Sequence, residues 1–344
     1  MKFILFCKQP YAFSILKPLE EEILKRGFKA LWFVPKKIIN LFPYSNSDVI
    51  TDIKQAKDYS SDAILVPGNE VPHFLRGVKV QVFHGLAGEK KGHFRIRDYF
   101  DLYLTQGPYF TDRFNELKQK YKNFDVVETG WCKLDNLYYI DDKIVEKKNR
   151  LIKKYNVKKI ILYAPTFSPS LTSASKLYEI IKKLSKDDNI LIIIKFHDLM
   201  DENYKKNYFD LEKNNLLISK EKDIINLMKI SDIMISDTSS VVYEYILLDK
   251  PVVTLNSKSK NITWEDFEDE KKLLFSIYNI LADNDEYKEK RKKTIQLYHP
   301  YMDAKSSKRM IDAVIQYIDR FNVPQKRKLS ILRKFKIYKE FGIN

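Results

Sequence analysis

Short apolar runs alternate with amphipathic segments along most of the chain. A short apolar run bounded by turn residues is typical of a strand buried on both faces of a parallel sheet. The runs of this kind are Lys2–Cys7, Ala30–Val34, Ser61–Val66, Lys79–Phe83, Asp101–Leu104, Asp125–Glu128, Ile160–Tyr163, Asn189–Phe196, Leu216–Ser219, Asp232–Ile235 and Pro251–Leu255. Helical spacing predicts helices over Ile15–Arg26, Tyr109–Tyr121, Lys143–Tyr155 and most of Phe267–Phe321. Strands that alternate with helices predict an α/β fold with doubly wound parallel sheets.

The alternation starts afresh at Ile160, after the highly charged segment Lys143–Tyr155. This restart predicts two Rossmann-like domains with a junction near residues 140–158, and 344 residues suffice for two domains of ordinary size. We expect an N-terminal domain over residues 1–145, a second domain over 146–320 and a basic amphipathic tail over 321–344.

A turn of small polar residues, Ser236–Ser240, lies between the strand Ile233–Ile235 and a helix predicted over Val241–Leu248. Backbone N–H groups and hydroxyls at a helix N-terminus bind anions, and in open α/β sheets ligands sit at the carboxyl ends of the strands. Many turns of this kind only cap a helix. The turn alone therefore leaves both an anion site and a plain cap open.

A histidine, His84, follows the predicted strand Lys79–Phe83 in the first half of the chain. Histidine commonly serves as a general base, and glycine allows close backbone approach and positive φ. The loop after His84 contains Gly85, Gly88, Lys90 and Lys91. This composition predicts a base beside a loop that contacts phosphate or acceptor, although a histidine satisfied by hydrogen bonds in the core is the alternative.

His197 ends a predicted strand in the second half, with Lys195 two residues before it. If the strand continued that far, both side chains would point to one side, where a cation and an imidazole suit phosphate oxygens. Thr166 follows another strand and places a hydroxyl near the same rim. For His73, His93 and His299, which lack such surroundings, we expect structural or surface roles.

The formal net charge is +15, which favours nucleic acid, an anionic membrane or an anionic substrate as a partner. The sequence has no zinc-finger spacing, no ribonucleoprotein-type aromatic motif and no glycine-arginine tract, so we expect no nucleic-acid partner. The two cysteines, Cys7 and Cys132, imply no disulfide framework and favour the cytoplasm. No apolar run reaches the length of a membrane span, and the N-terminus is predicted to be a strand rather than a signal peptide.

Together these motifs resemble the CDP-glycerol glycerophosphotransferases, the family of teichoic-acid primases and polymerases. The matching segments, in family order, are Phe83–Gly85, Gly130–Asp135, Leu162–Thr166, Lys195–His197, Ser236–Ser240 and Asp303–Arg309. This sequence has Leu86, Asp198 and Thr238 where the family usually has threonine, proline and tyrosine. The resemblance implies a GT-B fold, in which two Rossmann-like domains face a cleft. The first, over residues 1–145, would bind the acceptor, and the second, over 146–320, would bind the nucleotide donor.

The resemblance also implies a reaction: an alditol phosphate passes from a CDP-linked donor to a hydroxyl of a cell-surface glycan or lipid-linked acceptor, and CMP is released. By position, His84 would be the general base, and Lys195 and His197 would hold donor phosphate. The hydroxyls of Thr238, Ser239 and Ser240 would bind the diphosphate. In addition, Asp237 would orient the neighbouring loop and Glu244 would reach a ribose hydroxyl. No Asp-x-Asp pair is present where a metal would bridge the phosphates, so we expect neither a metal nor a cofactor.

Two other functions remain open at this stage. A GT-B glycosyltransferase that uses a nucleotide sugar would need a similar donor site, and a non-catalytic binder of nucleic acid or anionic polymer is suggested by charge alone. The tail Gln325–Phe341 is basic, with Leu329, Leu332, Phe335, Tyr338 and Phe341 at every third position. As a helix it would either lie on the anionic inner face of the cell membrane or pack on the first domain.

Overall fold

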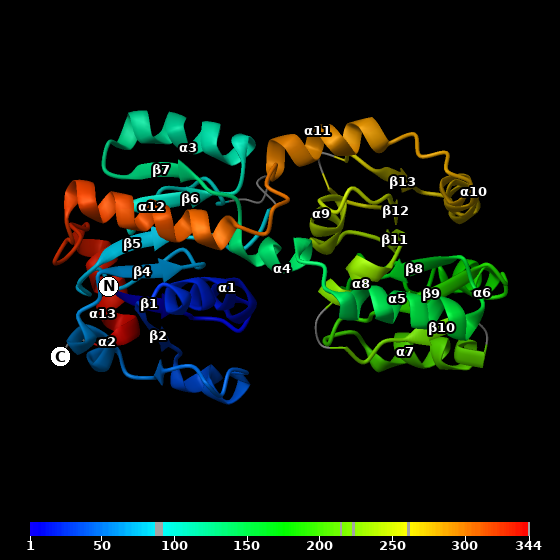
Figure 1. Ribbon diagram of the computed structural model, residues 1–344, viewed down its shortest axis with the longest axis horizontal. Coiled ribbons are helices and arrows are strands. Elements are labelled where there is room, and N and C mark those ends of the chain that lie inside the picture. The colour runs from blue at the N-terminus through cyan, green and yellow to red at the C-terminus, as the bar shows by residue number, and fades with distance from the viewer. Residues whose placement is uncertain (87–91, 214, 222–223, 260–261, 343–344) are drawn as a thin grey trace. The chain divides into compact units, whose positions relative to one another are not determined.

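The computed structural model describes residues 1–86, 92–213, 215–221, 224–259 and 262–342 (Figure 1). The chain divides into two compact units: unit 1 comprises Met1–Tyr138 and Gln296–Asn344, and unit 2 comprises Tyr139–Ile295. We expected the second domain to run over 146–320. Instead, the chain returns to unit 1 at Gln296, because the helix over Ser306–Phe321 packs against the first sheet rather than the second.

The described part of unit 1 contains one sheet of seven parallel strands in the order β3-β2-β1-β4-β5-β6-β7. The strands are β1 (Lys2–Phe6), β2 (Lys29–Phe33), β3 (Val49–Ile50), β4 (Ala63–Val66), β5 (Val78–Gln81), β6 (Leu102–Thr105) and β7 (Asp125–Glu128). Every residue of β4, β5 and β6 is buried, which fits strands covered on both faces. The strand order reverses between β1 and β4, and ligands of such sheets bind at this switch point.

Helices cover both faces of this sheet. They are α1 (Ala12–Lys25), η1 (Lys36–Leu41), α2 (Ile53–Tyr59), α3 (Pro108–Tyr121), η2 (Cys132–Leu134), α4 (Asp135–Tyr138), α12 (Ser306–Phe321) and α13 (Ile331–Phe341). In Figure 1, α12 runs alongside β5 and β6, and it also contacts α1. Its N-terminus is held by Asp135, whose carboxylate accepts the N–H groups of Ser306 and Ser307 at 2.7 and 2.6 Å. A carboxylate at a helix N-terminus satisfies free N–H groups and complements the helix dipole.

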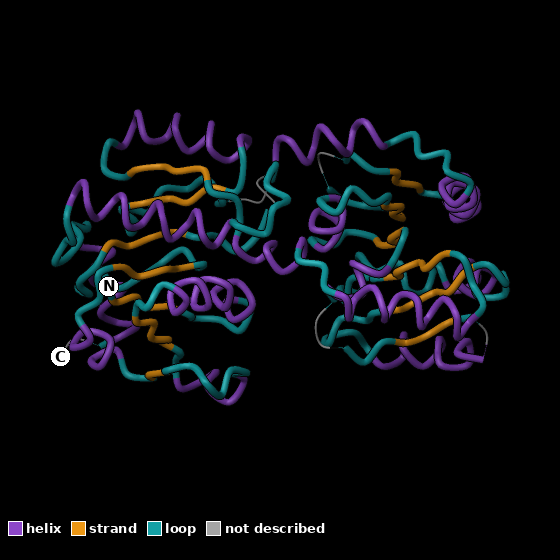
Figure 2. The backbone as a smooth tube through the Cα atoms, viewed as in Figure 1, coloured by secondary structure: helices purple, strands orange, loops and turns teal. Residues whose placement is uncertain are grey.

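The described part of unit 2 contains one sheet of six parallel strands in the order β10-β9-β8-β11-β12-β13, drawn in orange in Figure 2. The strands are β8 (Lys159–Tyr163), β9 (Ile190–Ile194), β10 (Leu216–Ile218), β11 (Ile233–Ser236), β12 (Val252–Leu255) and β13 (Glu265–Phe267). The strand order reverses between β8 and β11. We did not predict β13, because a strand of three residues with two acidic side chains forms no apolar run.

Helices also pack around this second sheet. They are α5 (Asp142–Tyr155), α6 (Tyr178–Leu184), α7 (Glu202–Phe209), η3 (Asp210–Lys213), α8 (Ile225–Ile230), α9 (Val241–Ile246) and α10 (Glu270–Leu281), with α11 (Lys288–Tyr298) leading back to unit 1. One cluster of buried apolar side chains joins the strands of unit 2 to α10. It includes Ile192 of β9, Ile235 of β11 and Ile277 of α10.

The tail helix α13 packs on unit 1 with one face. Ile337 is fully buried, and the ring of Phe341 lies 5.8 Å from that of Phe6. Just before the helix, Arg327 pairs with Asp101. The opposite face remains apolar and accessible, with Ile331, Leu332 and Phe335 between 68% and 84% exposed. Of the two arrangements expected for the tail, the one in which it packs on the first domain is therefore present. It leaves a second apolar face of α13 uncovered.

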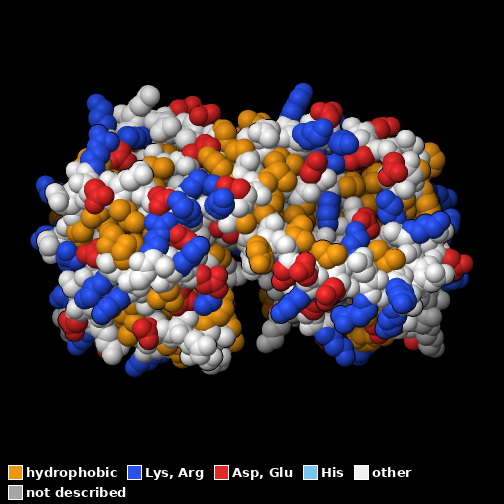
Figure 3. All heavy atoms as spheres, viewed as in Figure 1, with side chains coloured by type: hydrophobic (Ala, Val, Ile, Leu, Met, Phe, Trp, Pro, Cys, Tyr) orange, Lys and Arg blue, Asp and Glu red, His pale blue; other side chains and the backbone are white. Residues whose placement is uncertain are grey.

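Figure 3 shows Lys and Arg side chains interspersed with Asp and Glu side chains among the described residues on the face that it draws. Within the described ranges, no helix combines the length and the apolar character needed to cross a membrane.

Candidate functional site

His84 lies just beyond the carboxyl end of β5, with an exposed side chain. Its Nδ1 is 3.0 Å from the carbonyl oxygen of Pro67, which follows β4. A carbonyl oxygen can only accept a hydrogen bond, so Nδ1 carries a proton, and in the neutral ring Nε2 presents a lone pair that no hydrogen bond among the described residues engages. This is the tautomer that a general base needs.

Two buried glutamines hold the backbone around His84. Gln81 donates through Nε2 to the same Pro67 oxygen at 3.1 Å, and Gln106 donates to the carbonyl of Gly85 at 3.1 Å. Their side chains are 2% and 0% exposed. The carbonyl that orients the imidazole is therefore itself fixed. Sequence reasoning missed this arrangement because Pro67 and Gln106 follow β4 and β6, whereas His84 follows β5.

The residue before His84 has a strained backbone. Phe83 has a φ of +61°, in the left-handed region that bulky residues rarely adopt. Such a conformation costs roughly 1–3 kcal/mol and is often found at functional sites. The ring of Phe83 is held by stacking on His93 at 5.3 Å, and burial together with His84 lowers the pKa of His93 to about 4. Of the loop glycines that we expected to permit positive φ, Gly92 adopts one, at +97°, and Phe83 adopts another just before the histidine.

The loop that follows is described only in part. A Cβ added to Gly85 would meet no atom of the described residues within 4 Å, so packing among these residues does not require a glycine there. The predicted loop residues Gly88, Lys90 and Lys91 lie outside the described residues.

Tyr11 lies beside the histidine at the switch point of unit 1. Its ring centroid is 5.4 Å from that of His84, at an angle of 39°. The ring is 45% exposed, and Gly68 lies close to its Oη. Burial, with a smaller effect of the Cys7 thiol, raises the pKa of Tyr11, so the phenol keeps its proton at neutral pH. Sequence reasoning missed this residue, although its position just after β1 at a predicted sheet edge was the available signal.

In unit 2, Asp237 ties the turn after β11 to the loop after β8. Its carboxylate is fully buried and accepts the N–H groups of Thr166 at 3.0 Å and Ser173 at 2.8 Å. The hydroxyl of Ser173 donates to it as well, at 2.8 Å. Burial raises the pKa of Asp237, and these hydrogen bonds oppose the rise. Asp237 is therefore placed to orient the loop that contains Thr166.

The three hydroxyl residues that follow have different surroundings. Thr238 accepts the N–H of Lys258 at 2.9 Å, and Ser239 accepts the N–H of Val241 at 3.4 Å, which is a long hydrogen bond. Ser240 is exposed and makes no side-chain cap to the short helix α9. Glu244 is half-buried in the first turn of that helix. The side chain of Ser240 does not cap α9, so helix capping does not explain why a hydroxyl residue stands at this position.

His197 and Lys195 lie in a loop, because β9 ends at Ile194. The strand therefore does not persist to His197, which was the condition for both side chains to point to one side. Lys195 donates to the carbonyl of Phe196 at 2.9 Å and lies 3.5 Å from Asp198. In this chain Asp198 takes the position where the family usually has proline, and it pairs with the lysine.

The two site histidines have opposite tautomers. His197 accepts the N–H of Leu199 through Nδ1 at 3.1 Å, so its Nε2 carries the proton and can donate. Partial burial lowers the pKa of His197; Asp198 opposes this effect and Lys195 adds to it, so the ring is neutral near pH 7. Its ring lies 4.5 Å from that of Phe167, next to Thr166. Unit 1 thus presents an imidazole lone pair, and unit 2 presents N–H and hydroxyl groups suited to an anion.

Among the residues that the structure describes, no group of three or more His, Cys, Asp or Glu side chains is arranged to hold a metal ion.

Comparison with protein families gives one matching model. It is described as CDP-Glycerol:Poly(glycerophosphate) glycerophosphotransferase and matches residues 77–261, more than half of the chain. These residues include His84, His197 and the turn after β11, so the match spans candidate residues from both units.

Curated relatives act in teichoic acid synthesis. A teichoic acid glycerol-phosphate primase of Bacillus spizizenii is 32% identical over 45% of this chain and 39% of its own length. A teichoic acid poly(glycerol phosphate) polymerase of the same species is 25% identical over 70% of this chain and 68% of its own. The teichoic acid ribitol-phosphate polymerase TarL of Staphylococcus aureus is 25% identical over 67% of this chain and 46% of its own length. The chain thus spans between about two fifths and two thirds of these relatives.

Solved structures share the fold at low identity. The wall teichoic acid polymerase TagF matches with a TM-score of 0.64 at 18% identity, over 93% of this chain and 89% of that one. An S. aureus MnaA–UDP co-structure matches with a TM-score of 0.66 at 14% identity, over 96% and 99%. These matches confirm the predicted GT-B class with two Rossmann-like domains.

Proposed function

The chain belongs to the CDP-glycerol:poly(glycerophosphate) glycerophosphotransferase family, and on this premise we propose that it transfers an alditol phosphate. The donor is CDP-glycerol or a related CDP-alditol, and the acceptor is a hydroxyl of a cell-surface glycan or lipid-linked molecule. The observation that supports this most strongly is the His84 tautomer, with Nδ1 bound to a fixed carbonyl and Nε2 open.

In the proposed reaction, the acceptor oxygen attacks the β-phosphorus of the donor while its proton passes to Nε2 of His84. The bond from the β-phosphorus to the bridging oxygen breaks, and CMP leaves with that oxygen. Phosphoryl transfer depends on positioning and charge stabilisation more than on covalent chemistry. The N–H of His197, the ammonium of Lys195 and the hydroxyls after β11 supply both, so we propose that neither a metal nor a cofactor takes part.

A donor screen tests the function directly. We expect CMP release from CDP-glycerol or CDP-ribitol in the presence of an acceptor, at the same rate with and without a chelator of divalent metals. If UDP were released from nucleotide sugars and no CMP were released from the alditol donors, the result would support the glycosyltransferase alternative. Salt-dependent binding to anionic polymer without turnover of any nucleotide would contradict both enzymatic functions.

We further propose that the chain acts at the anionic inner face of the cell membrane. Ile331, Leu332 and Phe335 are strongly exposed on one face of α13, and Lys328, Lys334 and Lys339 belong to the same segment. Exposed apolar side chains on a basic helix suit the headgroup region of an anionic bilayer, where each basic residue contributes about 1 kcal/mol. Binding there would bring the enzyme to a lipid-linked acceptor.

Liposome flotation checks this surface without disturbing the buried face of α13. The triple variant Ile331→Ser/Leu332→Ser/Phe335→Ser should bind anionic vesicles at least about 10-fold more weakly, since it removes apolar area that would enter the interface. As a matched control, Leu24→Ser/Phe275→Ser/Leu297→Ser removes three side chains that are each at least 51% exposed elsewhere, and should bind like the wild type. Equal losses in both variants, or no vesicle binding by the wild type, would exclude α13 as the anchor.

A further inference from the structure

A cavity of about 800 Å³ lies in unit 1 at the sheet edge opposite to the one that holds His84. Its lining comes from the last turns of α3, the loop over residues 122–124, the first residue of β7 and Tyr317 of α12. Because β5, β6 and β7 are parallel, the loop before β7 and the loop after β5 lie at opposite edges. A strand of four residues separates these edges by at least about 10 Å. The cavity is therefore separate from the catalytic edge.

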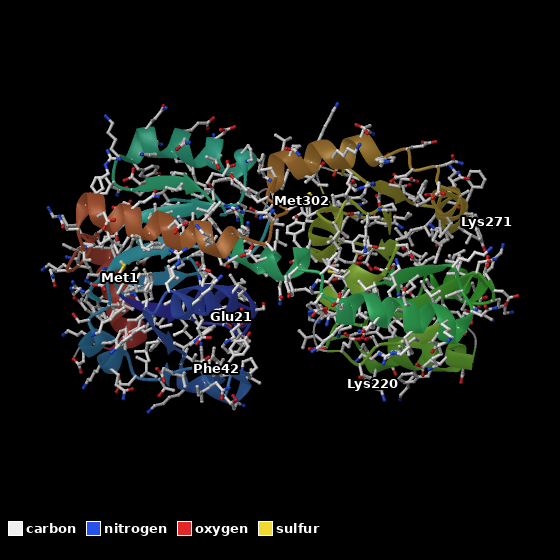
Figure 4. All side chains as sticks on the ribbon, in the orientation of Figure 1. Met1, Glu21, Phe42, Lys220, Lys271 and Met302 are labelled. Carbon is white, nitrogen blue, oxygen red and sulfur yellow. The ribbon has the colours of Figure 1, made fainter. Side chains whose placement is uncertain are left out.

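Two helices end beside this cavity. Figure 1 shows the C-terminal ends of α3 and α12 at the same end of the sheet. In Figure 4, which draws the side chains of both helices as sticks, Met302 marks the chain just before the other end of α12. Tyr317 lies in the last two turns of α12, so side chains from two helices reach the same cavity.

Two side-chain amides of α3 line the cavity. Asn115 and Gln119 are four residues apart, so they lie on the same face of the helix, and both are exposed. Neither amide forms a hydrogen bond within the described part of the chain. An amide donates through its nitrogen and accepts through its oxygen, and a hydroxyl likewise does both. Two neighbouring amides are therefore suited to the adjacent hydroxyls of one ligand.

The charged residues of the lining nearly balance one another. They are Lys118, Lys122 and Asp125. The ammonium of Lys118 is 2.5 Å from the carboxylate of Asp125, whereas Lys122 is exposed and has no carboxylate within salt-bridge distance among the described residues. A lining with one unpaired cation favours a neutral ligand, or one with isolated negative charges, over a compact polyanion.

Tyr317 adds a phenol and an aromatic surface. Its hydroxyl forms no hydrogen bond with any described residue. Burial, reinforced by Asp101 and Asp125, raises the pKa of Tyr317 to about 12, so the phenol is protonated at neutral pH. The ring of Phe321, which is 48% exposed, lies 4.8 Å from that of Tyr317. Aromatic surface beside hydrogen-bonding groups suits a sugar or an alditol, which has C–H groups between its hydroxyls.

The loop before β7 is fixed without a ligand. Arg327 donates to the carbonyl oxygens of Asn123 at 2.7 Å and of Asp98 at 2.6 Å. The amide of Asn123 donates to the carboxylate of Asp98 at 3.1 Å, and Phe124 is buried in the core of unit 1. A loop that is already in place lowers the ordering cost of binding.

We propose that this cavity is a second binding site, separate from the edge that holds His84, for a sugar or alditol unit of a polymer. The amides of Asn115 and Gln119 and the phenol of Tyr317 bind its hydroxyls, and Lys122 lies near any phosphate that follows. The unit belongs either to a polysaccharide or to an alditol phosphate polymer, since both are rich in hydroxyls. A polymer held here keeps a high local concentration at the enzyme when its end leaves the catalytic edge.

A titration followed by nuclear magnetic resonance, without donor, tests the site. The backbone N–H signals of residues 118–125 report on this cavity, so a ligand bound near His84 does not enter the measured Kd. The probes are cellotetraose, a tetramer of 1,3-linked glycerol phosphate, and tripolyphosphate as an anion without hydroxyl-bearing carbons. The wild type should bind at least one of the first two probes more tightly than tripolyphosphate. The tighter of the two identifies the kind of polymer.

The variant Asn115→Ala/Gln119→Ala should weaken binding of that probe at least about 10-fold, because it removes two hydrogen-bonding groups. Binding of tripolyphosphate should change less than about 2-fold, since the variant removes no charge. The matched control Asn203→Ala/Asn207→Ala removes two exposed amides that are also four residues apart, on α7 of unit 2, and should bind every probe like the wild type.

Three results would overturn the site: no binding of either hydroxyl-rich probe by the wild type, unchanged binding in Asn115→Ala/Gln119→Ala, or equal weakening in the control. Tyr317→Phe keeps the ring and removes the hydroxyl, and should weaken binding about 3-fold. An unchanged Kd in Tyr317→Phe would overturn the role of the phenol. The titration needs no turnover, so its result does not depend on whether the proposed transfer takes place.

Discussion

Replacing His84 with alanine should lower the rate of CMP release from the CDP-linked donor by about 100-fold or more, which is the effect expected for loss of a general base. The imidazole is the group at this edge whose Nε2 lone pair is open, because Nδ1 is engaged by the Pro67 carbonyl. Without it, the acceptor hydroxyl must lose its proton to water. The assay is steady-state CMP release with donor and acceptor both saturating.

The control for this experiment is His84→Asn. Its side-chain amide can still donate to the Pro67 oxygen but offers no basic nitrogen, so it separates orientation from basicity. We expect the same large loss of rate, with the unfolding temperature of both variants close to that of the wild type because the His84 side chain is exposed. A folded His84→Ala protein that turns over at nearly the wild-type rate would remove His84 from the mechanism.

Replacing Asp237 with alanine should have the second largest effect, on both stability and donor binding. The substitution leaves the N–H groups of Thr166 and Ser173 and the hydroxyl of Ser173 without their partner inside unit 2. An unsatisfied buried donor costs about 1–3 kcal/mol, so the free energy of unfolding should fall by about 3 kcal/mol or more. The loop after β8 would also lose its attachment to the turn after β11, and the affinity for CDP-linked donor should fall with it.

Denaturant unfolding and calorimetric titration with donor measure these two effects separately. In both stability and donor affinity, Asp237→Asn should fall between the wild type and Asp237→Ala. Its amide oxygen can still accept a hydrogen bond, but its amide nitrogen would face N–H and O–H donors. Asp198→Ala is the control, since that carboxylate is 84% exposed and its removal should change stability by less than about 1 kcal/mol. If Asp237→Ala were as stable as Asp198→Ala and bound donor equally well, Asp237 would have no positioning role.

The sequence by itself determined the class of fold and the chemistry at each sheet edge. Fully apolar runs such as Ile190–Ile194 can be buried on both faces only in a parallel sheet covered by helices, so the local pattern predicts the architecture. A polar residue directly after such a run must lie at the carboxyl edge, which placed His84 and Asp237 correctly. The order of the motifs then pointed to the family that the comparison confirms.

Only the tertiary structure decided which sheet the last helices cover. The N-terminus of α12 is held by Asp135, which lies 171 residues before Ser306, and a helical stripe does not reveal which distant carboxylate or sheet it meets. For the same reason, the pattern of the tail could not show that α13 buries Ile337 and leaves Leu332 exposed.

The tautomers of the two site histidines also required the fold. Which ring nitrogen carries the proton depends on whether the facing atom is a carbonyl oxygen, as for His84 and Pro67, or an N–H group, as for His197 and Leu199. Pro67, Gln106 and Tyr11 follow strands other than β5, so spacing along the chain did not show their contacts near His84, although the position of Tyr11 after β1 placed it at the same sheet edge. Sequence pattern specifies periodic burial, whereas contacts between residues far apart in the chain exist only once the sheets have formed.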